Sequence, residues 1–178
     1  MNNDFVAFPK IPRLSREIII TEKIDGTNAC IRITDDGIIT AGSRSRWITP
    51  ADDNYGFAAW VQENSEELMG LGVGTHYGEW WGAGIQRKYG VSSKRFSLFN
   101  TSRWGENRPS CCGVVPVLYT GVFDSLAVET VIEMLRKNGS MAAPGFMKPE
   151  GVVVYHTAGN SFFKKMLEHD EERKRKPV

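Results

Sequence analysis

The amino-acid sequence predicts an α+β fold of mainly antiparallel sheets with flanking helices. Many short segments carry the alternating or continuous apolar pattern of strands, whereas few segments repeat apolar residues at helical spacing. The strands do not alternate strictly with helices, so a doubly wound parallel sheet is not expected. The 178 residues suit one domain, because domains of roughly 100–200 residues bury a sufficient core.

The first half of the chain combines strand patterns with one helical region. Residues 17–23 carry an isoleucine run, and residues 29–34 alternate between apolar and polar side chains. The Asp-Asp-Gly sequence at 35–37 is a strong hairpin signal, so we expect the next strand at 37–41. Residues 57–68 repeat apolar side chains at the spacing of one or two short helices.

The second half contains the clearest helix, at residues 124–138. Asp124 or Ser125 can cap its first turn, and Gly139 ends it. The charged tail at residues 163–176 is also predicted to be helical. Four further segments have strand character, at 75–80, 95–100, 116–122 and 151–156.

The composition is that of a globular protein. Hydrophobic residues make up 41% and charged residues 24%, which excludes wholesale disorder. No apolar run approaches the ~18 residues of a membrane-spanning helix, and the first residues lack the pattern of a secretory signal. Cys30, Cys111 and Cys112 form no CxxC motif, so neither disulfides nor a zinc site is expected. These features favour a reducing, cytoplasmic location.

One motif suggests covalent chemistry. Residues 22–28 read Glu-Lys-Ile-Asp-Gly-Thr-Asn, which places Lys23 at the end of the isoleucine-rich strand and before a glycine turn. A lysine amine is a nucleophile only when neutral, and a rigid strand end can aim it at a bound phosphorus. Alone the motif is weak, because Asp-Gly is also an ordinary turn and a lysine often ends a strand in solvent.

Five more short motifs follow in a fixed order. They are Gly-Ser-Arg at 42–44, Tyr-Gly-Glu at 77–79, Phe-Ser-Leu-Phe-Asn at 96–100, Glu-Gly-Val-Val at 150–153 and Phe-Phe-Lys-Lys at 162–165. The whole set resembles the covalent nucleotidyltransferases, namely ATP-dependent DNA and RNA ligases and mRNA capping enzymes. The glutamate before the lysine, the Gly-Thr-Asn after it and the Tyr-Gly-Glu-Trp-Trp-Gly stretch are most similar to RNA ligases of the RNA ligase 2 type.

The resemblance implies roles around a phosphate. Lys23 would attack the α-phosphate of ATP and become lysyl-adenylate, and Glu150 would bind Mg²⁺ or Mn²⁺. Lys164 and Lys165 would contact the α-phosphate. The family often has Lys-x-Lys where this chain has adjacent lysines. Adjacent strand residues point to opposite faces, so one of the two is expected to be peripheral, and we favour Lys164 as the phosphate contact.

The resemblance also implies contacts to the nucleoside. Glu22 would contact the adenine amino group, and Glu79 would bind a ribose hydroxyl. Phe99 would stack on adenine, with Phe96 as the alternative. Many ligases have aspartate after the stacking phenylalanine, whereas Asn100 occupies that position here.

The net charge of +1 conceals a local basic surplus. Residues 48–86 carry a net charge of −6 and residues 87–108 carry +5, so the basic stretch is expected to contact the RNA backbone. Arg44 would hold the ribose or nucleic-acid phosphates, with Arg46 as the alternative. The further candidate RNA contacts are Asn28, Arg46, Arg87 and Lys88.

The sequence thus predicts an ATP-dependent RNA ligase that joins 5′-phosphate and 3′-hydroxyl ends through an adenylylated 5′ end, with ATP and Mg²⁺ or Mn²⁺ as cofactors. Residues 1–178 are expected to form a single nucleotidyltransferase domain without a separate C-terminal or OB-fold domain. The alternatives are a minimal DNA ligase, a GTP-using capping enzyme and a nucleic-acid-binding module without ligation activity. Whether the RNA is a nicked duplex, a broken loop or a single strand stays open.

Overall fold

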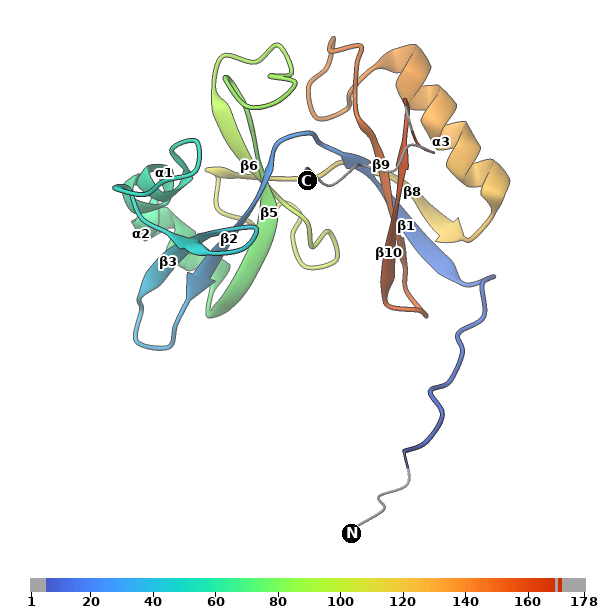
Figure 1. The fold of residues 1–178 in the computed structure, drawn as a ribbon, viewed down its shortest axis with the longest axis horizontal. Coiled ribbons are helices and arrows are strands. Elements are labelled where there is room, and N and C mark those ends of the chain that lie inside the picture. Colours follow the sequence, from blue (N-terminus) through green and yellow to red (C-terminus); the bar gives the residue numbers. More distant parts are fainter. Residues whose placement is uncertain (1–5, 169, 171–178) are drawn as a thin grey trace, which may run out of the picture.

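Two β-sheets, each covered by helices on one face, make up the fold in the computed structural model, which describes residues 6–168 and 170. Figure 1 shows the sheets side by side, with α3 outside one of them and α1 and α2 outside the other. All strand pairs are antiparallel except β6–β7. This arrangement confirms the predicted α+β class.

The four-stranded sheet has the order β10–β9–β1–β8. Helix α3 (Ser125–Asn138) packs on one face, where Ile18 and Ile20 meet its buried residues. Asp124 caps this helix by accepting a hydrogen bond from the Leu126 N–H at 2.9 Å. The strands are β1 (Glu17–Lys23), β8 (Val117–Val122), β9 (Gly151–His156) and β10 (Ser161–Met166).

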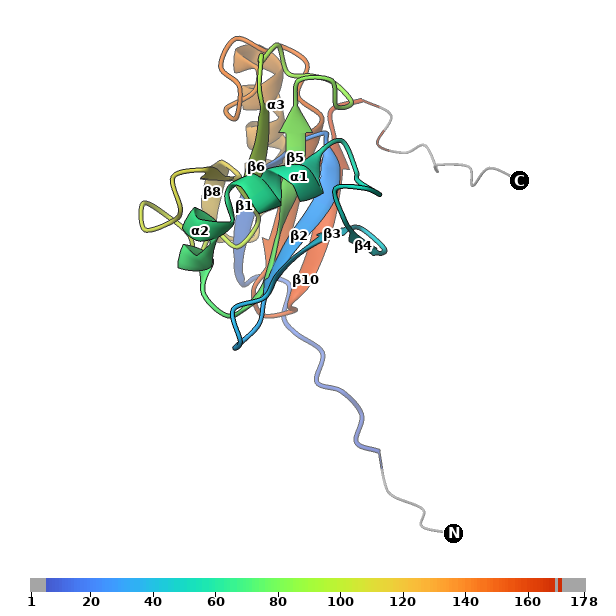
Figure 2. The same ribbon diagram turned by 90° about the vertical axis from the view of Figure 1, so that its left-hand side faces the viewer.

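The six-stranded sheet has the order β4–β3–β2–β5–β6–β7. Its helix-covered face is a core of aromatic rings, in which the Phe57 centroid lies 5.3 Å from Trp80 and 5.1 Å from Phe96. Figure 2 shows α1 and α2 in front of this sheet. The helical elements are α1 (Phe57–Glu63), α2 (Ser65–Leu68) and a 3₁₀ turn (Met69–Leu71). The strands are β2 (Thr27–Ile33), β3 (Ile39–Ser43), β4 (Trp47–Ile48), β5 (Gly74–Gly82), β6 (Lys94–Leu98) and β7 (Cys112–Val114).

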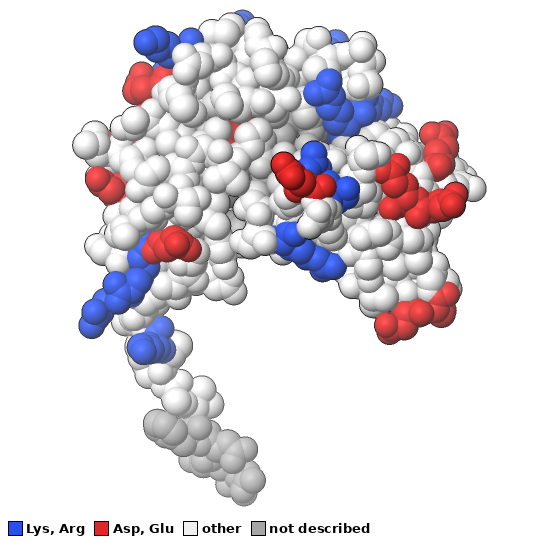
Figure 3. All heavy atoms as spheres, turned by 180° about the vertical axis from the view of Figure 1, so that it is seen from behind, with Lys and Arg blue, Asp and Glu red and all other residues white. Residues whose placement is uncertain are grey.

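The two faces without helices form the inner walls of the molecule. Successive strand residues point to opposite faces. Ile18 and Ile20 pack toward α3, so Lys23, at an odd position of β1, belongs to the inner face. In β5, Trp80 packs in the aromatic core, so Glu79 lies on the inner face. Figure 3 shows the surface hollowed between the two halves, with basic and acidic side chains around the hollow.

A third apolar cluster joins the two sheets above this hollow. Ile24, which follows Lys23, packs with Trp81, Tyr89, Val115 and Ala143. Trp81 belongs to β5, and the other four residues lie in connecting segments: Ile24 after β1, Tyr89 after β5, Val115 between β7 and β8, and Ala143 after α3. The cluster fixes the turn after β1 against β5.

Most predicted elements are confirmed, and the main error is at the C-terminal end. Residues 163–166, predicted to be helical, lie in β10 and pair with β9, while residues 171–176 lie outside the described residues. Charge composition does not report strand pairing, which here comes from the neighbouring β9. The short strands β4 and β7 were also not predicted. No helix within residues 6–168 is long and apolar enough to cross a membrane.

Gly26 shows how closely β5 approaches the turn after Lys23. A Cβ atom at Gly26 would clash with the Trp80 carbonyl oxygen and would lie 2.7 Å from the Trp81 Cβ. We therefore expect Gly26→Ala to lower the free energy of unfolding by about 1–3 kcal/mol, the usual cost of overpacking. Urea denaturation measures this change.

The matched control is Gly105→Ala, because a Cβ at Gly105 would meet no atom within 4 Å. This variant should stay within about 0.5 kcal/mol of the parent protein. Equal stability of the Gly26 and Gly105 variants would contradict the close approach of β5.

Candidate active site

Lys23 and Glu150 form a partly buried ion pair at the end of β1, on the inner face of the four-stranded sheet. Lys23 is the last residue of β1, and its backbone pairs with Gly151 of β9. The Lys23 Nζ lies 2.5 Å from the Glu150 Oε2, with the two side chains 25% and 8% exposed. Strand pairing therefore brings two motifs 127 residues apart into direct contact.

Glu79 faces this pair from the other sheet. Its carboxylate is buried and accepts hydrogen bonds from the Gly26 N–H at 3.0 Å and the Asn28 side-chain amide at 3.2 Å. Burial raises the pKa of Glu79 to about 7, against the lowering effects of Lys23 and of the Gly26 hydrogen bond. The charge of Glu150 adds to the rise. Three motifs thus meet around Lys23.

An arginine clamp holds the segments on either side of the pair. The Arg87 Nε donates to Asp25 at 3.0 Å, and its Nη1 donates to the carbonyl of Lys148 at 3.0 Å. The Asp25 N–H donates to the buried hydroxyl of Tyr89 at 2.8 Å. The clamp ties the turn after Lys23 to the residues that precede Glu150. Sequence reasoning assigned Arg87 to RNA because an intramolecular partner 62 residues away leaves no local signal.

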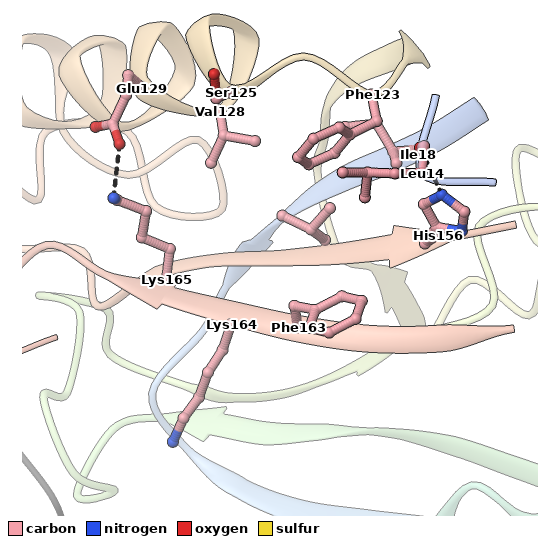
Figure 4. Close-up of a pocket in the computed structure, with 11 residues that line it drawn as sticks. Leu14, Ile18, Phe123, Ser125, Val128, Glu129, His156, Phe163, Lys164 and Lys165 are labelled. Atoms are coloured by element: carbon pink, nitrogen blue, oxygen red, sulfur yellow. Dashed lines mark hydrogen bonds and ion pairs between the residues drawn. The ribbon is translucent and has the colours of Figure 1, made fainter. Parts of the chain in front are cut away.

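Lys164 and Lys165 separate onto opposite faces of the sheet. Lys164 pairs with Val153, which itself pairs with Thr21 on the inner face. Lys165 points to α3, where its Nζ lies 2.6 Å from the Glu129 carboxylate, and this hydrogen bond raises the pKa of Lys165. Figure 4 shows the two side chains pointing apart. Only Lys164 shares the face of Lys23.

A groove of about 260 Å³ lies on the α3 side of this sheet (Figure 4), and Lys23 is not among the residues that line it. Ile18, Val128 and Phe163 line it, together with the ion pair of Lys165. Lys164 also borders the groove, but its side chain points away from Lys165 and from α3 (Figure 4).

Glu22 also belongs to the α3 side, so its carboxylate is not brought together with Lys23. It is almost fully buried and accepts three hydrogen bonds. The donors are the Ser140 hydroxyl at 2.6 Å and the N–H groups of Met141 and Ala142 at 2.8 and 2.9 Å. In this structure, the carboxylate that was expected to contact adenine holds the loop after α3.

The two candidate stacking phenylalanines differ in burial. Phe96 is fully buried and packs against Phe57 and Trp60, so it has no face available for a ligand. Phe99 is 40% exposed and follows β6, where its N–H donates to the Tyr77 carbonyl. Asn100 serves the turn that follows, because its side-chain oxygen accepts from the Arg103 N–H at 3.1 Å.

Arg44 and Arg46 follow β3 and are both exposed. Arg46 forms an ion pair with Asp52, and its Nη2 lies 3.0 Å from the Asp52 Oδ1. Among the described residues Arg44 has no hydrogen bond or ion pair. Asn28, a candidate RNA contact, donates to Glu79 instead.

The basic stretch at 87–108 is largely engaged within the protein. Lys94 donates to the Tyr55 carbonyl at 2.6 Å, and the Arg95 guanidinium lies 5.4 Å from the Trp81 ring centroid. Arg87, Arg103 and Arg108 also donate to backbone carbonyls. Lys88 is exposed, and within the described residues its side chain forms no hydrogen bond or ion pair, although its backbone N–H donates to the Ile85 carbonyl.

Carboxylates for a cation are present without a complete ligand set. Within residues 6–168 and 170, no group of three or more His, Cys, Asp or Glu side chains is arranged to hold a metal. Glu150 and Glu79 nevertheless face the same amine. One or two carboxylates suit Mg²⁺, which keeps several waters and takes phosphate oxygens as its remaining ligands.

A family model described as RNA ligase matches residues 16–167, which is most of the sequence. The chain therefore belongs to the RNA ligase family. The match does not separate subtypes, so the RNA ligase 2 type stays a prediction.

Solved structures of Naegleria gruberi RNA ligase have a similar fold. A mutant with ATP and Mn matches with a TM-score of 0.63 and 21% identity, over 89% of this chain and 52% of that chain. A second mutant, with AMP and Mn, matches with a TM-score of 0.60 and 20% identity, over 90% and 53%. This chain thus spans about half the length of these structures. No protein with curated information matches significantly.

The raised pKa of Glu79 makes stability depend on pH. Between about pH 4.5 and pH 7 the folded protein keeps a proton that the unfolded chain releases, so stability falls as pH rises. We expect this side chain alone to lower the free energy of unfolding by up to about 3 kcal/mol across that range. Glu79→Gln should remove the decline, as measured by urea denaturation at pH 5 and pH 8.

The exposed Glu106 offers a matched control, because Glu106→Gln removes one carboxylate without touching a buried group. This variant should keep the pH dependence of the parent protein. If the free energy of unfolding changed with pH in the same way for the parent protein and for the Glu79 variant, Glu79 would not be the group that keeps a proton in the folded state.

Proposed function

We propose that this chain catalyses ATP-dependent RNA ligation, in which Lys23 carries AMP before the AMP passes to an RNA 5′-phosphate. The contact of Lys23 with Glu150, opposite Glu79 and on the face of Lys164, is the observation that carries this proposal. Membership of the RNA ligase family supports it. Similar structures of Naegleria gruberi RNA ligase hold ATP, AMP and pyrophosphate, which are the nucleotide substrate and the two released products of such a ligation as a whole.

In the first step the Lys23 amine forms a bond to the α-phosphorus of ATP while the bond to pyrophosphate breaks. The amine must first lose a proton, and the Glu150 carboxylate 2.5 Å away is placed to accept it. Lys164, on the same face, would neutralise charge on the phosphate oxygens. After that proton has passed from Glu150 to solvent, the carboxylate would be free to hold a divalent cation, which would supply further positive charge to those oxygens.

The nucleoside would lie between the inner walls. We assign the ribose to Glu79, whose hydrogen bonds from Gly26 and Asn28 fix its orientation before any ligand binds. Phe99 offers the exposed ring for adenine, since Phe96 is enclosed. Glu22 would act indirectly, by holding the loop after α3 through its three hydrogen bonds.

In the later steps the RNA 5′-phosphate displaces Lys23 from AMP, and a 3′-hydroxyl then displaces AMP from the RNA. Of the basic residues predicted to meet the RNA, Arg44 and Lys88 are the ones without internal partners among the described residues. We propose the two sheets as one catalytic domain. A DNA ligase would use the same lysine, so transfer to 5′-phosphorylated RNA and DNA separates the two candidates.

Lys23→Ala should abolish labelling of the protein by α-³²P-ATP, because no other amine replaces the Nζ beside Glu150. Gel analysis after incubation with Mg²⁺ measures the label. Lys137→Ala, at the exposed end of α3, is the control and should label normally. Persistent labelling of the Lys23 variant would overturn the assignment of the nucleophile.

The two adjacent lysines should differ sharply. Lys164→Ala should slow labelling by about 100-fold, the typical effect of removing one stabilising group from a transition state. Lys165→Ala should label within about twofold of the parent protein, because it loses only an exposed ion pair with Glu129. Initial labelling rates at saturating ATP compare the two variants. An equal loss of labelling rate in both would contradict the placement of Lys164 and Lys165 on opposite faces of the sheet.

A further inference from the structure

We propose that Phe162, stacked on Tyr155, forms a platform on which one unpaired base of the RNA stacks. The inference rests on the proposed function and adds a substrate contact on the inner face of the four-stranded sheet. The two ring centroids are 4.6 Å apart at an interplanar angle of 25°. The Tyr155 hydroxyl donates a hydrogen bond to the Asn160 side-chain oxygen at 3.0 Å, which fixes the ring of Tyr155.

The register of the sheet places this pair on the wall that carries the nucleophile. Tyr155 pairs with Ile19 on one side and with Phe162 on the other. Ile19 and Lys23 share the inner face of β1 and are four residues apart, about 13 Å along a strand. Lys164 is two residues from Phe162. Through Val153 it is level with Thr21, which lies between Ile19 and Lys23 on β1. An RNA strand that enters the hollow would therefore pass the two aromatic rings first, then Lys164, and then the amine of Lys23.

The exposure of Phe162 sets it apart from a purely structural partner. Its side chain is 69% exposed, although Tyr155 is only partly exposed beneath it. Cross-strand aromatic pairs stabilise hairpins, but that role does not require a ring as exposed as that of Phe162. Every base has a flat face, so an open aromatic ring binds unpaired RNA with little sequence preference.

The charge along β1 limits the size of the platform. The next inner-face residue beyond Ile19 is Glu17, which is exposed. A carboxylate there would repel RNA phosphates, whereas Lys164 on the other side of the rings would attract them. The contact thus fits one base close to the reacting end.

The chain provides a matched control in the neighbouring residue. Phe163 is also a phenylalanine of β10, is 61% exposed, and lines the groove on the α3 side. Phe162→Ala and Phe163→Ala therefore remove the same side chain from opposite faces of one strand. Comparison of their unfolding free energies separates loss of RNA contact from loss of stability.

The test measures binding of the full chain to a short 5′-phosphorylated single-stranded RNA by fluorescence anisotropy. A set of otherwise identical strands each carries one abasic nucleotide. The parent protein should lose about 5- to 100-fold in affinity at one position near the 5′ end, the range for one base–aromatic stack. Phe162→Ala should lose the same factor with the intact strand and nothing more with that abasic strand.

Phe162→Trp should bind as the parent protein does, and so should Phe163→Ala. The platform is overturned if the Phe162 and Phe163 variants bind alike, if no abasic position is coupled to Phe162, or if the parent protein does not bind the strand. Labelling with ATP is scored separately on the parent protein. Absence of label would contradict the proposed ligase chemistry, while the abasic series would still decide the platform.

Discussion

The alternation of side chains along β1 is the constraint on which the site depends. It places Glu22 and Lys23, adjacent in sequence, on opposite faces of one strand. Lys23 therefore meets Glu150 on the inner wall, and Glu22 is buried on the opposite face, where it holds the loop that follows α3. A shift of β1 by one residue would exchange the two charges and leave the inner wall without its amine.

Charged contacts also fix the segments around this strand. Glu79 binds the turn after Lys23 from the opposite sheet, and Arg87 joins Asp25 to the residues before Glu150. Several charged residues of the motifs thus position the reacting groups, and only some of them face the hollow.

Local patterns predicted much of the fold. The strand at residues 17–23 and the helix at residues 124–138, observed at 125–138, were both predicted, because each signal lies within one element. The helix predicted for the tail at 163–176 was wrong at residues 163–166, because these residues form a strand that exists only through pairing with β9. Likewise, phenylalanine composition could not distinguish Phe96 from Phe99, because burial depends on the packing of α1 against β6.

The sequence by itself determined the fold class and the ordered motifs, in which Lys23 is the proposed nucleophile, because each motif consists of residues close together along the chain. Tertiary structure alone decided which partner each charge has: Arg87 binds Asp25, Lys165 binds Glu129, and Lys164 is left on the inner face. Partners of this kind lie tens of residues apart. Their meeting depends on strand register and sheet packing, and neither leaves a signal in any single segment.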